Sequence, residues 1–339
     1  MEKASINKRI SVIVVTAGLS EYIKLCLDSI NEQSIKPQEI IVVDNSLNDN
    51  FSQNIKKNYP NIKLYKSRQN LYYAQALNIG IEISSGDFIL CLNDDVILES
   101  DFIKHAQKGF SIDNGIGMVS GKILRLDKKT IDTTGLFLSI FRTAQERGYG
   151  LKDKGQFDKE GYIFGVNGAV AFYRRKMLEE IKINSDYFDS DYNIFYEDLD
   201  IAWRAQNFGW KGYYIPTAIA YHARGKTVRA DVREGRKFAR FYISDELNFD
   251  LIKNRYLTII KNETLWGFLL HLPFIFIYDI FVLGYIFLFR QKVLKIFFLK
   301  NLAIKSAFSK RQRIYQTINY IKKRRTSYPD EVTGVVEGL

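Results

Sequence analysis

The sequence predicts an α/β fold, in which helices cover both faces of a mostly parallel sheet. Along the first 110 residues, apolar runs typical of buried strands alternate with segments of helical periodicity, and the connections between them are short. Strands that are buried on both faces have continuous apolar sequences, as at 10–15, 40–43 and 88–92. In such sheets ligands bind at the carboxyl ends of the strands.

The individual elements follow from these patterns in chain order. Ile23, Leu27 and Ile30 recur at helical spacing, and Gly209 is a natural helix stop. Up to residue 115 we expect strands at 10–15, 40–43, 62–65 and 88–92, and helices at 21–31, 49–58, 74–83 and 102–110. Beyond it we expect strands at 116–120, 122–126, 213–215 and 218–221, helices at 174–181, 197–206 and 229–262, and a polar, mobile loop region at 127–160.

The formal net charge of +11 belongs to the C-terminal part of the chain. Residues 1–249 carry 34 Lys and Arg against 32 Asp and Glu, a net of +2, whereas residues 250–339 carry a net of +9. In this part the basic residues alternate with long apolar runs, which favours an anionic membrane surface over nucleic acid as a partner. Cys26 and Cys91 have no metal or redox spacing, which is typical of a reducing compartment.

Polar side chains follow the predicted strands at the points where ligands would bind. Two buried strands end in carboxylates, an acidic patch opens the helix at 197–206, and the strand at 218–221 leads into a histidine. The residues are Asp44, Asn93, Asp94, Asp95, Glu197, Asp198 and His222. This layout suits a nucleotide held by a metal ion and an acid–base step.

These segments, in this order, resemble the inverting glycosyltransferases of family 2, which have the GT-A fold, and within them the rhamnosyltransferase-like subgroup that acts on cell-envelope polysaccharides. Asn70–Gly80 is similar to the family's Asn-x-Gly-aromatic-Ala stretch, although Tyr72 replaces the usual glycine. Phe188-Asp189, followed by 195–198, resembles its Phe-Asp-Glu and Glu-Asp-x-Asp block. The resemblance implies a GT-A (Rossmann-like) catalytic domain at 1–225 and a basic and apolar helical region at 226–339.

For a nucleotide-sugar donor, the resemblance implies binding residues at several strand ends. Asp44 would accept the N–H of a uracil or thymine base, although an Asp at this place also suits the cap of the next helix. Thr16 and Ala17 would let the backbone approach the nucleotide. Arg68 and Asn70 would reach a phosphate or the base, or else form a solvated loop. The other residues implied in donor contacts are Asn93, Asp94 and Gly168.

The resemblance also implies a Mn²⁺ or Mg²⁺ ion, with Asp95 and His222 as its protein ligands. A sugar diphosphate needs a hard divalent cation to neutralise the leaving group, and such ions prefer oxygen ligands. Two adjacent acids at a buried strand end would repel each other without a cation. A lone histidine is otherwise typical of a hydrogen-bonded core residue, and this alternative stays open for His222.

Asp198 is implied as the general base, which takes the proton from the acceptor hydroxyl in a single displacement at the anomeric carbon. Such a base contributes ~10²–10⁴-fold to the rate. Glu197 beside it raises the local negative potential and so supports the basicity of Asp198. The alternative is that acids are simply favourable in a first helical turn.

The segment 265–289 is long and apolar enough to cross a bilayer. Pro273 would start or kink its helix, and Asp279 is costly near its centre. A single crossing conflicts with orientation, because nucleotide sugars and the basic stretch 290–325 both require the cytoplasmic side. We therefore expect a re-entrant or in-plane helix at the cytoplasmic face of the cell membrane; a single span and a helix buried in the core or in an oligomer are the alternatives. Four lysines would meet anionic headgroups, namely Lys292, Lys295, Lys300 and Lys305.

The sequence thus predicts a metal-dependent inverting glycosyltransferase. It would move a sugar, with rhamnose as the first candidate, from a UDP- or dTDP-sugar to a glycan or polyprenyl-linked acceptor in cell-surface polysaccharide synthesis. A sugar nucleotidyltransferase would have a similar sheet, but residues 16–20 lack the glycines and basic residues of its phosphate loop. A catalytically silent membrane adaptor that binds nucleotide would not need Asp95, Asp198 and His222 together. Nucleic acid is not an expected partner, and an oligomer is compatible with the sequence.

Overall fold

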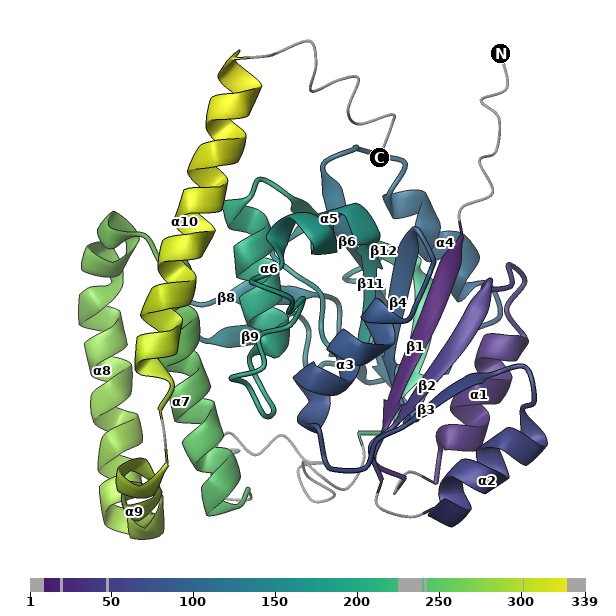
Figure 1. Cartoon of the computed structure of the whole chain (residues 1–339), viewed down its shortest axis with the longest axis horizontal. Coiled ribbons are helices and arrows are strands. Elements are labelled where there is room, and N and C mark those ends of the chain that lie inside the picture. The colour runs from purple at the N-terminus through teal and green to yellow at the C-terminus, as the bar shows by residue number, and fades with distance from the viewer. Residues whose placement is uncertain are drawn as a thin grey trace.

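The computed structural model describes residues 9–18, 21–46, 49–224, 240, 243–300 and 302–327, with side chains up to residue 321. A large sheet carries helices on both faces, and long C-terminal helices lie beside it (Figure 1). The strands are β1 (Ile10–Thr16), β2 (Glu39–Asp44), β3 (Lys63–Lys66), β4 (Phe88–Asn93), β5 (Val96–Leu98), β6 (Ile116–Arg125), β7 (Ile131–Thr133), β8 (Leu136–Leu138), β9 (Ala144–Glu146), β10 (Gly161–Ile163), β11 (Val170–Arg174) and β12 (Lys211–His222). The helices are α1 (Ile23–Asn31), α2 (Asp49–Asn58), α3 (Tyr72–Glu82), α4 (Phe102–Gly109), α5 (Arg175–Ile181), α6 (Glu197–Asn207), α7 (Asp245–Asn262), α8 (Leu265–Phe289), α9 (Gln291–Leu299) and α10 (Ile304–Ser327).

The carboxyl ends of the N-terminal strands meet at one edge of the sheet. The strand order is β10-β12-β6-β11-β4-β1-β2-β3, and β1 pairs in parallel with both β2 and β4. In this register Thr16 lies opposite Asp44, and Val15 lies opposite Asn93. β11 lies antiparallel between β4 and β6, whereas β12 runs parallel to β6. The predicted α/β sheet with flanking helices is therefore confirmed, and its C-terminal half is mixed in direction.

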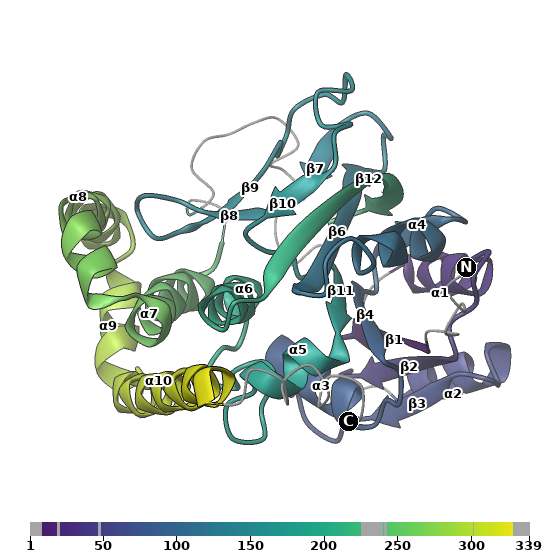
Figure 2. The same cartoon turned by 90° about the horizontal axis from the view of Figure 1, so that it is seen from above.

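Alternate residues of the central strands belong to two separate hydrophobic cores, one on each face of the sheet (Figure 2). Ile13 and Val15 of β1 pack in the core with α3, α5 and α6, whereas Val12 and Val14 pack in the core with α1 and α4. Successive side chains of a strand point to opposite faces, so a strand covered on both sides needs apolar residues at every position. The two helix layers thus explain the continuous apolar runs of the sequence.

Two pairs of predicted strands are single strands in the structure. The strands expected at 116–120 and 122–126 form β6, and those expected at 213–215 and 218–221 form β12. Gly121 does not end β6. A Cβ at this position would lie 2.1 Å from the carbonyl oxygen of Ala218, so glycine is required where β6 and β12 approach each other closely.

The predicted mobile loop at 127–160 was wrong in part, because it contains three short strands. β7 pairs with β6, while β8 and β9 form a separate hairpin. Each of these strands has three residues, which is too short for an alternating pattern to be recognised in the sequence. The region carries acidic residues to the edge of the sheet where the other polar strand ends lie, as described below.

The C-terminal helices pack on the rest of the chain through α7, which lies against α6, and through α10. Ile314 and Ile318 of α10 belong to the core that also contains α3 and α6. The helix expected at 229–262 is observed from Asp245, and residues 229–239 lie outside the described ones. The predicted domain boundary between 225 and 226 also lies outside them, so the division into two domains stays a prediction.

A buried ionic cluster ties α7 and α10 to the segment that precedes α6. Lys261 of α7 is fully buried; it contacts Asp189 and lies 2.9 Å from Asp200. Lys310 of α10 contacts Asp189 as well. Burial alone would raise the pKa of Asp189, but the charges of Lys261 and Lys310 lower it well below its ordinary value. The C-terminal helices therefore neutralise acids that belong to the sheet part of the chain.

Replacing Lys261 by methionine keeps the approximate side-chain volume but leaves Asp189 and Asp200 without this cation. We expect the free energy of unfolding to fall by up to about 3–5 kcal/mol, the range for removing one partner of a buried ion pair, since Lys310 still contacts Asp189 and Arg204 still pairs with Asp200. Lys24→Met breaks an exposed pair with Asp28 and should leave the free energy of unfolding nearly unchanged. Equal effects of the two substitutions in urea unfolding would contradict the role of the cluster.

Candidate active site

A hydrogen bond between side chains joins the ends of β1 and β4. Thr16 Oγ1 donates to Asp94 Oδ2 at 2.6 Å and accepts from the N–H of Gly18 at 2.9 Å. Burial raises the pKa of Asp94 to about 6, and the hydrogen bond from Thr16 acts in the opposite direction. The parallel pairing of the strands thus brings the polar groups that follow them into direct contact.

Asp95 and His222 form a buried pair next to this contact. Asp95 Oδ1 lies 3.2 Å from His222 Nε2. The two residues meet because β5, which begins directly after Asp95, pairs antiparallel with the end of β12. The other ring nitrogen of His222, Nδ1, lies 2.8 Å from Asp132 Oδ2 on β7. Burial alone would lower the pKa of His222, but its hydrogen bonds with Asp132 and Asp95 raise it to about 9.

Arg224 and Glu146 extend this row of charges. Arg224 pairs with Asp132, and its Nη2 lies 3.5 Å from Glu146 Oε1. The same oxygen of Glu146 accepts a hydrogen bond from Asn167 Nδ2 at 3.0 Å. Burial alone would raise the pKa of Asp132, but the hydrogen bond with His222 and the charge of Arg224 lower it. Acidic and basic groups therefore alternate along the row.

Backbone N–H groups hold the carboxylate of Asp198 at the N-terminus of α6. Gly168 N–H donates to Oδ2 at 3.2 Å, and Leu199 N–H donates to Oδ1 at 2.7 Å. Burial raises the pKa of Asp198, and these hydrogen bonds oppose the rise. Burial, together with the charge of Asp198, raises the pKa of the neighbouring Glu197 to about 8. The pair therefore shares less negative charge near neutral pH than two solvated carboxylates would.

The turn that leads into α6 has an unusual backbone. Phe195 and Tyr196 have φ angles of 71° and 70°, in the left-handed region that costs a non-glycine residue about 1–2 kcal/mol. Asn254 of α7 donates hydrogen bonds to the carbonyl oxygens of Ile194 and Phe195, at 2.8 Å and 2.9 Å. Helix α7 therefore stabilises the backbone conformation that places the acidic pair at the start of α6.

Together these contacts form one continuous row at the edge of the sheet, which we call the acidic row. From one end to the other it consists of Thr16, Asp94, Asp95, His222, Asp132, Arg224, Glu146, Asn167, Gly168 and Asp198. Among the described residues, no group of three or more His, Cys, Asp or Glu side chains is placed to hold a metal ion. The acidic row thus offers Asp95 and His222 as a pair and not as a complete protein cage.

Asp44 lies outside the acidic row, with a carboxylate that is already engaged by the protein. It is fully buried, accepts from the N–H of Ser46 at 2.8 Å and from the hydroxyl of Ser52, and lies 3.2 Å from Lys66 Nζ. These contacts join the end of β2 to Ser46 and to Ser52 of α2. A nucleotide base would share the carboxylate with these donors.

The remaining predicted binding residues line the loops beside the acidic row. Asn93 lies at the end of β4, where its N–H donates to the carbonyl oxygen of Ala169 at 3.0 Å. Ala17 and Arg68 are exposed. Asn70 Oδ1 accepts from the N–H of Tyr72 at 2.9 Å and so ends the loop that leads into α3. Tyr72, at the place where the resembled family has glycine, has a φ of 55° and keeps the left-handed backbone without the glycine.

Asp132, Glu146 and Arg224 are not identified from the sequence as members of a site. A single acid between two β-branched residues, as in 131–133, is a weak signal of a buried carboxylate, and Arg224 follows His222 by two residues. No local pattern marks Glu146, because its strand has three residues. Their membership of the acidic row depends on contacts between segments far apart in the chain.

Comparison with known proteins places this geometry in a family. The family model for glycosyl transferase family 2 matches residues 11–182. Poly-beta-1,6-N-acetyl-D-glucosamine synthase of Staphylococcus epidermidis is 23% identical over 222 residues, which are 65% of this chain and 51% of that protein. The enzyme of the same name from Staphylococcus aureus (strain COL) is 24% identical over 215 residues, 62% of this chain and 49% of that protein. The chain thus spans about half the length of the curated relatives it matches.

Solved structures share the fold at low sequence identity. GalNAc-T7 with UDP, GalNAc and Mn²⁺ has a TM-score of 0.56 and 14% identity, covering 75% of this chain and 48% of that chain. Mannosyltransferase PcManGT from Pyrobaculum calidifontis, in complex with GDP-Man and Mn²⁺, has a TM-score of 0.51 and 16% identity, covering 91% of this chain and 74% of that chain. Because the family model matches half of the chain, the protein belongs to glycosyl transferase family 2, and its sheet with flanking helices is the GT-A fold.

Proposed function

We propose that the protein is a metal-dependent inverting glycosyltransferase. It moves a sugar from a UDP- or dTDP-sugar to a glycan or polyprenyl-linked acceptor in cell-surface polysaccharide synthesis. The observation that carries the proposal is the acidic row, in which Asp95, His222 and Asp198 lie along one continuous set of contacts. The names of the staphylococcal relatives, which are polysaccharide synthases, support the class of product.

Several nucleotide sugars are candidate donors for this protein. The resemblance of the sequence points to dTDP-rhamnose, and the names of the curated relatives point to UDP-N-acetylglucosamine. Incubation of the protein and Mn²⁺ with these two donors and GDP-mannose, followed by measurement of released nucleoside diphosphate, identifies the one that is used. No release from any of them, with or without octyl glycosides as acceptors, would count against the proposed function.

Asp95 and His222 suit a divalent cation. Two ligands at right angles around an ion, each ~2.1 Å from it, are ~3 Å apart. The observed separation of 3.2 Å between Asp95 Oδ1 and His222 Nε2 is close to this. Asp132, on the other ring nitrogen, is the kind of carboxylate that orients a metal-bound imidazole. The protein would supply these two ligands to Mn²⁺ or Mg²⁺, and oxygens of the diphosphate and water would supply the others.

The transfer itself follows from the position of Asp198. The acceptor hydroxyl oxygen attacks the anomeric carbon, the bond from that carbon to the diphosphate breaks, and the hydroxyl proton goes to a carboxylate oxygen of Asp198. Hydrogen bonds from Gly168 and Leu199 fix the orientation of this carboxylate, and burial raises its pKa, which supports its basicity. A bound divalent cation would stabilise the charge of the leaving diphosphate.

Asp198→Asn should abolish transfer and keep donor binding. The amide cannot take the proton, and we expect kcat to fall by about 10²–10⁴-fold, the usual contribution of a general base. Binding of UDP with Mn²⁺, measured by calorimetry, should stay within about twofold of wild type. Asp113→Asn, at a carboxylate paired with Lys211 at the opposite end of β12 from His222, is the matched control. Retained turnover in Asp198→Asn would remove Asp198 as the base.

Asp95→Ala should weaken nucleotide binding only when the metal is present. We expect the Kd of UDP in Mn²⁺ to rise at least about tenfold, because one of two protein ligands is lost, and the Kd in EDTA to stay unchanged. Asp113→Ala serves as the control for loss of a carboxylate elsewhere. An unchanged Mn²⁺ dependence of UDP binding in Asp95→Ala would contradict the ligand assignment.

We also propose that the protein lies on the cytoplasmic face of the cell membrane, attached through α8, α9 and the start of α10. Among the described residues, α8 is the one helix long and apolar enough to cross a membrane, with a mean hydropathy of 2.2, yet only 11% of that stretch is buried. Trp266 of α8 is 80% exposed, and Phe298 of α9 is 90% exposed. So much exposed apolar surface is unfavourable in water and suits a lipid boundary.

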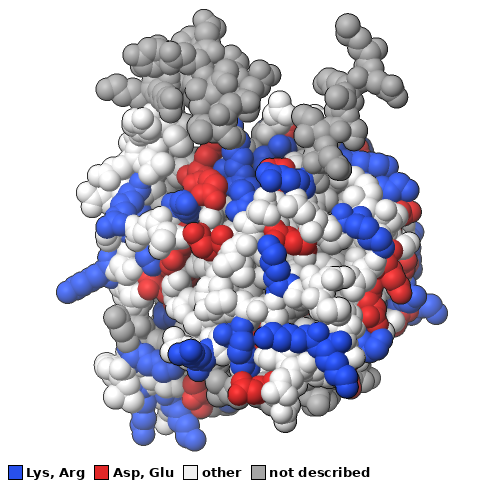
Figure 3. Space-filling view, turned by 45° about the vertical axis from the view of Figure 1, so that its right-hand side comes forward, with Lys and Arg blue, Asp and Glu red and all other residues white. Residues whose placement is uncertain are grey.

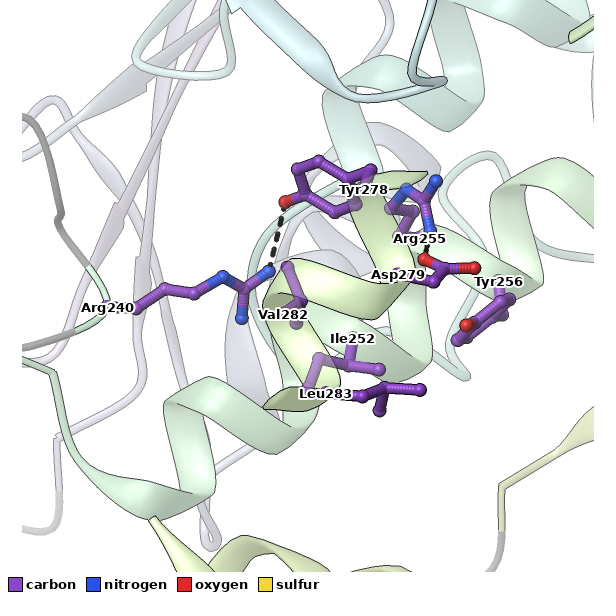
Figure 4. A pocket seen from close by; sticks show the side chains of 8 residues that line it. All are labelled: Arg240, Ile252, Arg255, Tyr256, Tyr278, Asp279, Val282 and Leu283. Carbon is purple, nitrogen blue, oxygen red and sulfur yellow. Dashed lines mark hydrogen bonds and ion pairs between the residues drawn. The ribbon is translucent and has the colours of Figure 1, made fainter. Parts of the chain in front are cut away.

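The charged residue within α8 faces the protein and not the lipid. Asp279 pairs with Arg255 of α7 at 2.6 Å, and Arg255 lies over the ring of Tyr278 (Figure 4). Pro273 lies inside α8, which begins at Leu265 and does not start at the proline. An in-plane helix, with α7 beneath the face that carries Asp279, avoids the cost of placing this carboxylate in hydrocarbon.

The basic residues of the tail lie where headgroups would be. Lys292, Lys295, Lys300 and Lys305 are exposed on and next to α9 and at the start of α10. Figure 3 shows another face of the molecule, on which acidic side chains lie between the basic ones. The two halves of the chain differ in net charge, which is +2 for residues 1–249 and +9 for residues 250–339.

Charge reversal at two of these lysines should weaken membrane binding. We expect Lys292→Glu with Lys295→Glu to lower partitioning into vesicles with 30% phosphatidylglycerol at least about tenfold, because each basic residue near an anionic surface contributes about 1 kcal/mol. The matched control is Lys56→Glu with Lys57→Glu on α2, both exposed in the wild type. Absence of vesicle binding by the wild type, together with a stable oligomer in solution, would instead assign α8 to a contact between copies.

A further inference from the structure

Glu146 has a place in the acidic row that the proposed reaction does not yet use. It is the last residue of β9, and it lies opposite Leu136 of β8. Leu136 in turn forms a bridge with Gly165, so the open end of the β8–β9 hairpin lies against the segment 165–168. Glu146 accepts a hydrogen bond from Asn167, and the next residue, Gly168, donates one to Asp198. These two residues therefore link Glu146 to the proposed base.

One oxygen of the Glu146 carboxylate is left without a partner. Oε1 accepts from Asn167 at 3.0 Å and lies 3.5 Å from Arg224. Oε2 is shielded from solvent and has no hydrogen-bond partner, and among the described residues the only other carboxylate oxygen of this kind is Oε2 of Glu197. A buried polar atom without a partner is costly, so one in a native protein calls for an explanation, such as a functional role or a contact that a bound group supplies.

The neighbours of Glu146 restrict the chemistry of that ligand. A metal ion is disfavoured, because Asn167 presents an N–H donor and Arg224 a positive charge to the same carboxylate. A phosphate is disfavoured because Glu146 would repel it. Asp132 and Asp198, whose charges raise the pKa of Glu146, would repel it as well. A hydroxyl group can donate a hydrogen bond to the unpartnered oxygen without either penalty. Sugars are the hydroxyl-rich part of both substrates in the proposed reaction.

The hairpin that carries Glu146 is held at its other end as well. Arg142, at the turn, pairs with Glu263 and lies 2.9 Å from His271 Nδ1 of α8. The carbonyl oxygen of Phe141 accepts from Arg255 of α7 at 2.7 Å. A carboxylate on a strand fixed at both ends is pre-organised, which is what a residue that orients a substrate hydroxyl requires.

We propose that Glu146 is a substrate-binding residue that accepts a hydrogen bond from a sugar hydroxyl through Oε2, while Asn167 and Arg224 hold Oε1. The proposal rests on the proposed glycosyl transfer. The hydroxyl belongs either to the sugar that is transferred or to the acceptor sugar. In the first case Glu146 acts in donor hydrolysis and in transfer, and in the second case it acts in transfer alone.

The test compares Glu146→Gln, Glu146→Ala and the wild type under three conditions. The first is binding of UDP with Mn²⁺ and the thermal midpoint, which report on the fold and the nucleotide site. The second is hydrolysis of the nucleotide sugar that the wild type uses, with water as the acceptor. The third is transfer to an octyl glycoside. Gln145→Ala is the matched control, because Gln145 precedes Glu146 on the same strand and is exposed on its other face.

We expect Glu146→Gln to keep UDP binding and the thermal midpoint and to lose about 10–100-fold in kcat/KM, the usual effect of removing a hydrogen bond to a charged group. A loss already present in hydrolysis assigns the hydroxyl to the donor sugar, and a loss confined to transfer assigns it to the acceptor. Activity within twofold of wild type in all assays overturns the inference, as does a fall in UDP binding and thermal midpoint that parallels the loss of activity. A wild type without turnover of any nucleotide sugar overturns the proposed function instead, so the two failures are distinct.

Discussion

The active-site region depends on how the negative charge at one edge of the sheet is compensated. Parallel pairing brings the polar ends of β1, β2 and β4 to this edge, with carboxylates at the last two, and β7, β9 and α6 add further carboxylates. Carboxylates this close raise one another's pKa and repel unless cations or N–H groups lie among them. His222 and Arg224 supply positive charge within the acidic row, and backbone N–H groups donate hydrogen bonds to the carboxylate of Asp198. The side-chain positions of the site follow from these pairings.

Helix α7 contacts both the turn before α6 and the apolar helix α8. Asn254 holds the left-handed turn before α6, and Lys261 neutralises acids on the segment leading to that turn. The next residue after Asn254, Arg255, pairs with Asp279 of α8 and accounts for a carboxylate in an otherwise apolar helix. Adjacent residues of α7 therefore contact the turn before α6 and the helix α8.

The β8–β9 hairpin makes a second connection between the same two regions. Its turn contacts α7 and α8 through Phe141 and Arg142, and its last residue, Glu146, contacts Asn167 in the acidic row. The C-terminal helices and the acidic row are therefore joined by side-chain contacts through α7 and through the hairpin, and Arg255 of α7 takes part in both. For an enzyme whose acceptor is lipid-linked, such connections would keep the site at a constant height above the membrane surface.

By itself the sequence determined the fold class, the strands and helices of the first 110 residues and the polar strand ends, because apolar runs and helical spacing are local properties of the chain. Asp95 and His222 could be proposed as metal ligands because the family resemblance implies that role at their positions. Only the tertiary structure decided that Asp132, 90 residues from His222, contacts the second ring nitrogen of that histidine. The same holds for the place of Glu146 in the acidic row. The physical reason is that a strand of three residues has no periodicity to detect, whereas its hydrogen bonds to distant strands fix its position in the folded protein.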